Sequence, residues 1–289
     1  MMTKTLRQKL RDDLNFVLTN LGPRRAWSRL AGRISLWRQP LFTRLALWIW
    51  NRFDPLELHD SPAQRYASIH ECFTRPLKPD ARKIAPEPEI FCSPCDGILG
   101  AHGRIEDGML FQLKGKSYAL QDLVGPTDEH HPWRDGHFVT IRIKSNMYHR
   151  FHSPCKGTLT RSQYFPGDAW NVNPPTLSRV NQLFCRNERA CLHLHTAQGD
   201  WIALVPVAAI WVAGIRVHAL EQTDWRDWTN PRPLTPGFEV RKGEEMGWFE
   251  HGSTIVLISP ASLRMCEGLK EGDRLWMGQA LLRRCADAT

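Results

Sequence analysis

The chain has 289 residues, of which 42% are hydrophobic and 24% are charged, and this balance excludes an intrinsically disordered protein. The formal net charge is +8, and residues 1–60 hold eleven Lys and Arg against five Asp and Glu, so most of the excess is N-terminal. A basic segment suits an anionic partner, and the twelve Trp favour a lipid surface over nucleic acid because indole rings prefer the membrane interface.

Three basic amphipathic helices are predicted at the N-terminus. Apolar residues recur at helical spacing between residues 4 and 20, again after Pro23, and a third time from about Leu41 to Phe53. Such helices can pack on the rest of the protein with their charges in solvent. Because charge and aromatic residues coincide here, we expect residues 1–60 to associate with a membrane and residues 61–289 to form a second, β-rich domain.

The periodicity changes after the prolines of Phe73–Pro79, which end the helical region. Short apolar or alternating runs then follow one another, separated by Gly, Pro and Asp, and predict a mainly antiparallel β core and hence an α+β fold. Residues 221–238 are expected to form a loop between strands. The expected strands are Glu89–Cys92, Gly97–His102, Phe138–Lys144, Gly157–Tyr164, Ala190–Thr196, Trp201–Ile215 and Thr254–Ser259.

The eight cysteines are too sparse for a disulfide framework and indicate reduced thiols in the cytosol. Cys92 and Cys95 have the spacing of half a zinc site, but no second Cys-x-x-Cys completes it, so a packed, inert pair is expected. The N-terminus lacks a signal peptide's apolar core. The longest uncharged run, residues 201–215, is too short to span a bilayer.

Three groups of residues carry reactive side chains. Asp96 lies in a Pro/Gly turn, His149 and His152 follow a predicted strand, and Gly252 precedes Ser253 at the start of another. A carboxylate can orient an imidazole, which takes the proton of a hydroxyl so that its oxygen attacks a carbonyl. Gly252 has no side chain to shield its carbonyl, so the next residue could cleave this bond. Spacing alone does not show that the groups meet.

Two other interpretations of these residues stay open at this point. His149 and His152, together with His193, His195 or Asp96, could bind zinc with an open coordination position, as in a metal hydrolase. Alternatively, the chain is a non-catalytic module whose basic helices dock on membranes and whose β core binds a lipid head group.

A set of ordered motifs runs through most of the chain. The motifs are Phe73–Leu77, Ser93–Gly97, Lys114–Tyr118, Tyr148–His152, Tyr164–Asp168, Val172–Asn173, Leu183–Arg189, Lys242–Gly247 and Gly252–Thr254. In this order they resemble the bacterial phosphatidylserine decarboxylases, a membrane-associated, pyruvoyl-dependent family. The N-terminal 60 residues resemble the family in character more than in detail, since its members commonly begin with membrane-associating helices.

The resemblance implies that the chain makes its own cofactor. The Ser253 hydroxyl attacks the Gly252 carbonyl, an ester replaces the peptide bond, and elimination followed by hydrolysis leaves a pyruvoyl group at residue 253. The products are a β chain, 1–252, and an α chain, 253–289, held together as a heterodimer. Asp96 and His152 match the family's triad partners for this cleavage, and His149 matches the histidine implicated in the later decarboxylation.

The same resemblance implies the second reaction. The pyruvoyl ketone forms a Schiff base with the amine of phosphatidylserine and accepts the electrons released as carbon dioxide leaves, which gives phosphatidylethanolamine. An acid must then protonate the remaining carbon, and His149 is the candidate because an imidazole titrates near neutral pH.

The implied location is peripheral, on the cytoplasmic side of the cell membrane, with an anionic membrane surface as partner and no nucleic acid. A decarboxylase of the same self-processing type that acts on a soluble amino acid is a further alternative. The basic, Trp-rich N-terminus argues against it, because a soluble substrate gives no reason for membrane contact. His251 is a departure from the family, which usually has an apolar residue at this position.

Overall fold

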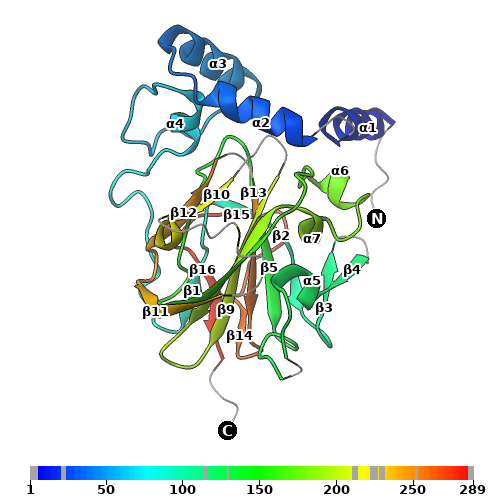
Figure 1. The fold of residues 1–289 in the computed structure, drawn as a ribbon, viewed down its shortest axis with the longest axis vertical. Coiled ribbons are helices and arrows are strands. Elements are labelled where there is room, and N and C mark those ends of the chain that lie inside the picture. Colours follow the sequence, from blue (N-terminus) through cyan, green and yellow to red (C-terminus); the bar gives the residue numbers. More distant parts are fainter. Residues whose placement is uncertain are drawn as a thin grey trace.

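A computed structural model describes residues 6–20, 24–112, 116–128, 130–209, 214–221, 227, 232–250 and 253–285. Three helices form the N-terminus and gather at one end of a β core, as Figure 1 shows: α1 (Leu6–Asn20), α2 (Arg24–Ser35) and α3 (Pro40–Phe53). These elements confirm the predicted helices within a few residues. None of the described helices is both long and apolar enough to cross a bilayer.

A short helix, α4 (Ile69–Phe73), ends the helical region. The Ser68 hydroxyl accepts a hydrogen bond from the Glu71 amide at its N-terminus, and the Glu71 carboxylate accepts one from the Ala67 amide, so these two bonds fix the start of the helix. The helix stops at Phe73, because Pro76 follows closely and cannot continue it.

The core is built on an eight-stranded antiparallel sheet in the order β11-β7-β8-β9-β13-β5-β2-β15. The central strand, β13, is buried along its whole length, and separate hydrophobic clusters cover the two faces of the sheet, with Ile255 in one and Val256 in the other. Burial on both faces explains why this strand is continuously apolar in sequence. The strands are β2 (Gly97–Arg104), β5 (His137–Ile143), β7 (Gly157–Phe165), β8 (Arg189–His195), β9 (Trp201–Ala208), β11 (Arg232–Val240), β13 (Ser253–Ser259) and β15 (Arg274–Leu275).

Two three-stranded sheets and a hairpin complete the core. One sheet joins β1 (Ile90–Cys92), β16 (Ala280–Arg284) and β14 (Leu263–Met265), and the other joins β10 (Ile215–Val217), β12 (Glu245–Phe249) and β6 (Arg150–His152). The hairpin pairs β3 (Met109–Gln112) with β4 (Lys116–Ala119). The short helices are α5 (Leu120–Val124), α6 (Pro174–Leu177), α7 (Leu183–Arg186) and the 3₁₀ turn η2 (His218–Leu220).

The α+β fold with a mainly antiparallel core is confirmed, and each expected strand is present. The loop expected over residues 221–238 is wrong from residue 232 onward, because that part forms β11; residues 222–226 and 228–231 lie outside the described residues. The prolines of β11 are tolerated since it is an edge strand, and its pairing with β7 shifts between Pro233 and Phe238.

The cysteines agree with a reduced protein. All eight are free, and Cys92 and Cys95 are both buried. Burial raises the pKa of each of these two thiols, so they stay protonated and unreactive near neutral pH. The pair is packed and inert, as the sequence predicts.

Candidate active site

Ser253 is the first residue of the central strand. Its Cα is paired with Ile143 of β5 and with Ala208 of β9. The side chain is fully buried, and its Oγ has no hydrogen-bond partner among the described residues. No hydrogen bond from a described residue therefore holds this oxygen in place. Burying a hydroxyl without a partner costs free energy, so a purely structural role does not explain a serine at this position. Gly252 and His251, on the other side of the expected cleavage site, lie outside the described residues.

His149 is held close to the segment that leads into Ser253. Its carbonyl accepts a hydrogen bond of 3.0 Å from the amide of Phe249, the last residue of β12. The imidazole is fully buried and packs edge-on against Phe73, with ring centroids 5.2 Å apart. Motifs far apart in the sequence therefore meet at this imidazole.

His152 lies at the other end of β6, where its Cα pairs with Glu245. Its Nδ1 lies 2.9 Å from the carbonyl oxygen of Gly243, and its Nε2 lies 2.9 Å from the hydroxyl of Tyr148. Because a carbonyl only accepts, we assign the proton to Nδ1, which leaves Nε2 as the basic nitrogen. Burial lowers the pKa of His152, so the ring is neutral near pH 7.

Gly243 supplies the carbonyl that orients this imidazole. Its φ is +76°, a left-handed conformation that other residues rarely adopt, and a Cβ at this position would lie 2.8 Å from the Ile84 side chain. The glycine of the Lys242–Gly247 motif is therefore needed for the backbone geometry that positions the His152 imidazole.

Asp96 is fully buried and is bound by Arg82. Arg82 donates from Nε to Oδ1 at 3.0 Å and from Nη2 to Oδ2 at 2.6 Å, and the Met277 amide donates to Oδ1 at 2.8 Å. Among the described residues, neither oxygen is hydrogen-bonded to His152. The two segments nevertheless touch, since the His152 amide donates to the Pro94 carbonyl at 2.7 Å. The hydrogen bond to the Gly243 carbonyl and the negative charges of Glu245 and Asp96 raise the pKa of His152 and so partly oppose the effect of burial.

Arg82 is a residue of this site that the sequence does not point to. It lies in a stretch without a motif, and its pairing with Asp96 joins segments that come together only in the fold. Arg82→Met is expected to destabilise the protein by about 3 kcal/mol, because the buried Asp96 carboxylate loses both hydrogen bonds from Arg82 and keeps only the Met277 amide and Arg274, whose Nη2 lies 3.8 Å from Oδ2. Urea unfolding at pH 7 measures this loss.

The matched control is Arg241→Met, which removes the exposed pair that Arg241 forms with Glu244. An exposed pair contributes less than about 1 kcal/mol, so this variant is expected to unfold close to the parent. Equal free energies of unfolding for the two variants would contradict the structural role given to Arg82.

Two arginines of the matched motifs hold the backbone together. Buried Arg75 donates to the carbonyl oxygens of Cys72, Glu57 and Met147, at 2.8, 3.0 and 3.0 Å. The second arginine, Arg150, donates twice to the Thr74 carbonyl and pairs with both oxygens of Glu245. With their donors engaged, neither is available for an anionic ligand.

The histidines proposed as zinc ligands do not converge. In the part of the chain that the structure describes, no group of three or more His, Cys, Asp and Glu side chains is placed to hold a metal ion. His193 stacks on Trp133 at 5.0 Å, and burial lowers its pKa to about 3, while His195 stacks on Trp201 at 4.4 Å. Their rings are packed against aromatic neighbours.

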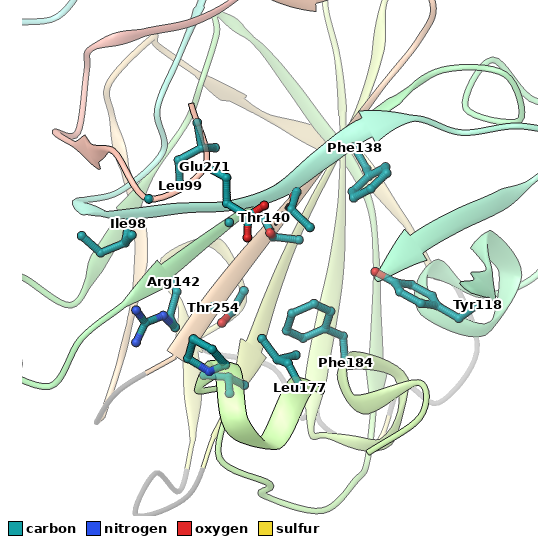
Figure 2. A pocket seen from close by; sticks show the side chains of 15 residues that line it. Ile98, Leu99, Tyr118, Phe138, Thr140, Arg142, Leu177, Phe184, Thr254 and Glu271 are labelled. Atoms are coloured by element: carbon teal, nitrogen blue, oxygen red, sulfur yellow. Dashed lines mark hydrogen bonds between the residues drawn. The ribbon is translucent and has the colours of Figure 1, made fainter. Parts of the chain in front are cut away.

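A pocket of about 130 Å³ lies beside the start of β13, on the face of the sheet that Ser253 does not point to. Figure 2 shows its lining, with Thr254 and Arg142 on neighbouring strands and Leu177 and Phe184 facing the sheet from α6 and α7. Most of this lining is apolar.

A sequence profile described as phosphatidylserine decarboxylase matches residues 69–283. Three curated relatives carry the name phosphatidylserine decarboxylase proenzyme. The protein of Brevibacillus brevis is 36% identical over 91% of this chain and 95% of its own length. The protein of Chromobacterium violaceum is 36% identical over 92% of this chain and 98% of its own length. The protein of Halorhodospira halophila is 35% identical over 96% of this chain and 96% of its own length.

Proposed function

The chain belongs to the phosphatidylserine decarboxylase family, and on that premise we propose that it converts phosphatidylserine to phosphatidylethanolamine after cutting itself between Gly252 and Ser253. The observation that carries the proposal is the buried Ser253 hydroxyl, which has no hydrogen-bond partner among the described residues at the start of the central strand. Such a hydroxyl is available for attack on the preceding carbonyl.

In the proposed cleavage, His152 is the base. Its Nδ1 proton is held by the Gly243 carbonyl, so Nε2, once the Tyr148 hydroxyl that contacts it moves aside, can take the proton of the Ser253 hydroxyl as the oxygen bonds to the Gly252 carbonyl carbon. The C–N bond then breaks, the amine takes up a proton, and an ester remains. Asp96 acts through its charge, which favours the protonated imidazole, and Arg82 holds that carboxylate in place.

Position 253 fits a pyruvoyl group. Formation of this group removes the Ser253 hydroxyl oxygen, and that oxygen makes no hydrogen bond to a described residue that would be lost. When present, the group would supply a ketone that accepts the electrons released as carbon dioxide leaves. His149, held beside the segment that leads into Ser253, is proposed to protonate the substrate carbon.

We further propose that the two products remain one heterodimer. The segment 253–289 contributes β13 to the middle of the large sheet, where it pairs with β5 and β9, and also β15 and β16, which pair with β2 and β1. Cutting one bond at the start of β13 leaves these ladders intact, so the α chain stays bound to the β chain.

The experiment is an intact-mass measurement on the purified protein, together with an assay of carbon dioxide release. We expect fragments corresponding to residues 1–252 and 253–289, the smaller one blocked at its N-terminus, and release from phosphatidylserine but not from free serine. A single uncleaved chain that is active would contradict the mechanism. Equal activity on free serine would favour the soluble-substrate alternative.

Residues 1–60 are proposed to hold the enzyme on the cytoplasmic surface of an anionic membrane. Among the described residues, the exposed large apolar side chains lie on or beside α1, α2 and α3, except for Phe238 and Trp276. Leu41, Trp48 and Phe53 are 84%, 67% and 85% exposed, and Arg38, Arg44 and Arg52 are also exposed on this segment. Apolar and basic groups on one surface are typical of interfacial helices.

Replacing Leu41, Trp48 and Phe53 together by Ser is expected to weaken binding to anionic vesicles by at least about tenfold, since each buried apolar side chain contributes about 1.5–3 kcal/mol. Vesicle co-sedimentation measures this, with Phe238→Ser on β11 as the control for a lost exposed aromatic residue. Unchanged binding of the triple variant would count against the proposed surface.

A further inference from the structure

Arg142 lies on β5 at the edge of the proposed reaction centre. Its Cα pairs with Thr254 of β13 on one side and with Ile98 of β2 on the other. Paired residues of neighbouring strands point to the same face, so Arg142 and Thr254 share the pocket face, whereas Ser253 points to the opposite one. Figure 2 shows both side chains at the end of the lining away from Tyr118.

The Arg142 guanidinium has no counterion in the part of the chain that the structure describes. The side chain is half-buried, and no hydrogen bond or ion pair joins it to another described residue. Burial lowers the pKa of Arg142, and no neighbouring carboxylate opposes this effect. A cation that loses water without gaining a partner is costly, so this one is suited to binding an anion that comes from outside the chain.

A second polar group of the pocket is also unused. The Thr254 Oγ1 is buried and has no hydrogen-bond partner among the described residues, whereas the neighbouring Thr140 hydroxyl donates to the Ala101 carbonyl at 2.7 Å. Glu271 also lines the pocket, but its side chain is exposed and forms no ion pair with Arg142. One unpaired cation and one free hydroxyl therefore face the same mostly apolar pocket, beside the residue at which the ketone is proposed to form.

We propose that Arg142 and Thr254 bind the phosphodiester of the phosphatidylserine substrate. This inference rests on the proposed function and names the group that positions its substrate. The apolar wall formed by Phe138, Leu177 and Phe184 takes the glycerol and the first part of an acyl chain. The pocket of about 130 Å³ is smaller than the roughly 300–1,000 Å³ of a site that encloses a whole ligand, so the rest of the lipid stays outside it.

The phosphodiester is favoured over the serine carboxylate for a chemical reason. The carboxylate loses its negative charge as carbon dioxide forms, so an arginine paired with it would stabilise the ground state more than the transition state. The phosphodiester keeps its charge throughout the reaction. A planar guanidinium can also bind two phosphate oxygens at once, which fixes the direction of the head group.

The wall of the pocket opposite the sheet is connected to the N-terminal helices. Pro174 and Leu177 of α6 line the pocket, and Thr176 between them accepts a hydrogen bond of 3.1 Å from the Asn20 side chain at the end of α1. In Figure 1, α1 lies beside α6. A lipid held at the proposed membrane surface is therefore near the pocket.

The test compares Arg142→Gln with Arg142→Lys in the full chain, using soluble dihexanoyl phosphatidylserine so that surface charge does not affect the result. We expect both variants to cleave like the parent and to unfold at the same temperature or higher. The KM of Arg142→Gln is expected to rise about 10- to 100-fold with little change in kcat. The KM of Arg142→Lys is expected to lie between that of the parent and that of Arg142→Gln, because lysine keeps the charge but cannot bind two oxygens at once. Arg264→Gln, an exposed arginine on β14, is the charge-matched control.

A second measurement identifies the bound group. Dihexanoyl phosphatidylethanolamine keeps the phosphodiester and lacks the carboxylate, and its Kd, measured by calorimetry, is expected to rise in Arg142→Gln as the KM does. An unchanged Kd with a raised KM would assign Arg142 to the carboxylate and overturn the proposal, as would an unchanged KM. A parent protein that neither cleaves nor decarboxylates would instead refute the proposed function.

Discussion

Ser253→Ala is expected to leave one chain of full length and to lower decarboxylation by at least about a thousandfold, because the variant has no oxygen to attack the Gly252 carbonyl and no source for the ketone. The fold should survive. Alanine removes a buried hydroxyl that has no hydrogen-bond partner among the described residues, so the free energy of unfolding is expected to stay equal or to rise slightly. Gel electrophoresis, intact mass and urea unfolding measure these three results.

The control for this variant lies on the same strand. Ser259, at the other end of β13, is also buried, and its Oγ likewise has no partner among the described residues. Ser259→Ala is therefore expected to cleave and to turn over like the parent. Cleavage of Ser253→Ala, or loss of cleavage in Ser259→Ala, would show that the position of the hydroxyl at the start of the strand is not what matters.

The two histidines of the Tyr148–His152 motif are expected to fail at different steps. His152→Ala should remain a single chain, since the base that takes the serine proton is gone. His149→Ala should cleave and then decarboxylate about 10²- to 10⁴-fold more slowly, which is the usual contribution of a positioned acid or base. Cleavage on gels and carbon dioxide release from the cleaved fraction separate the two effects.

His102→Ala, on β2, serves as the control for loss of an imidazole outside the site; its Nδ1 lies 3.1 Å from the carbonyl oxygen of Gly100. This variant is expected to cleave and turn over normally. If His149→Ala blocks cleavage while His152→Ala permits it, the assigned roles are reversed.

The strands of the core could be predicted because each leaves a local pattern. The continuous apolar run of β13 follows from burial on both faces, and β5, β7 and β8 are bounded by turn residues. The β11 strand could not be found in this way. Its prolines are typical of loops, and only its place at the edge of the sheet makes them compatible with a strand.

Some residues of the candidate site could also be predicted from the sequence, and others could not. Ser253, His149 and His152 stand in ordered motifs that the family resemblance identifies. The partners of the site residues could not be predicted, because Arg82 contacts Asp96 and Gly243 contacts His152 from distant parts of the chain. The direct Asp96–His152 contact expected of a triad is absent from the hydrogen bonds of the described residues, where Arg82 occupies the carboxylate.

By itself, the sequence determined the fold class, the basic N-terminal helices, the family and the candidate reactive serine, since each leaves a periodicity or a motif along the chain. Only the tertiary structure decided which side chains are left without partners. Arg142 is one arginine among many in the sequence, and it becomes a candidate phosphate ligand because cross-strand pairing sets it beside Thr254 in an apolar pocket without a described counterion. Burial and pairing depend on residues distant along the chain, so no local pattern records them.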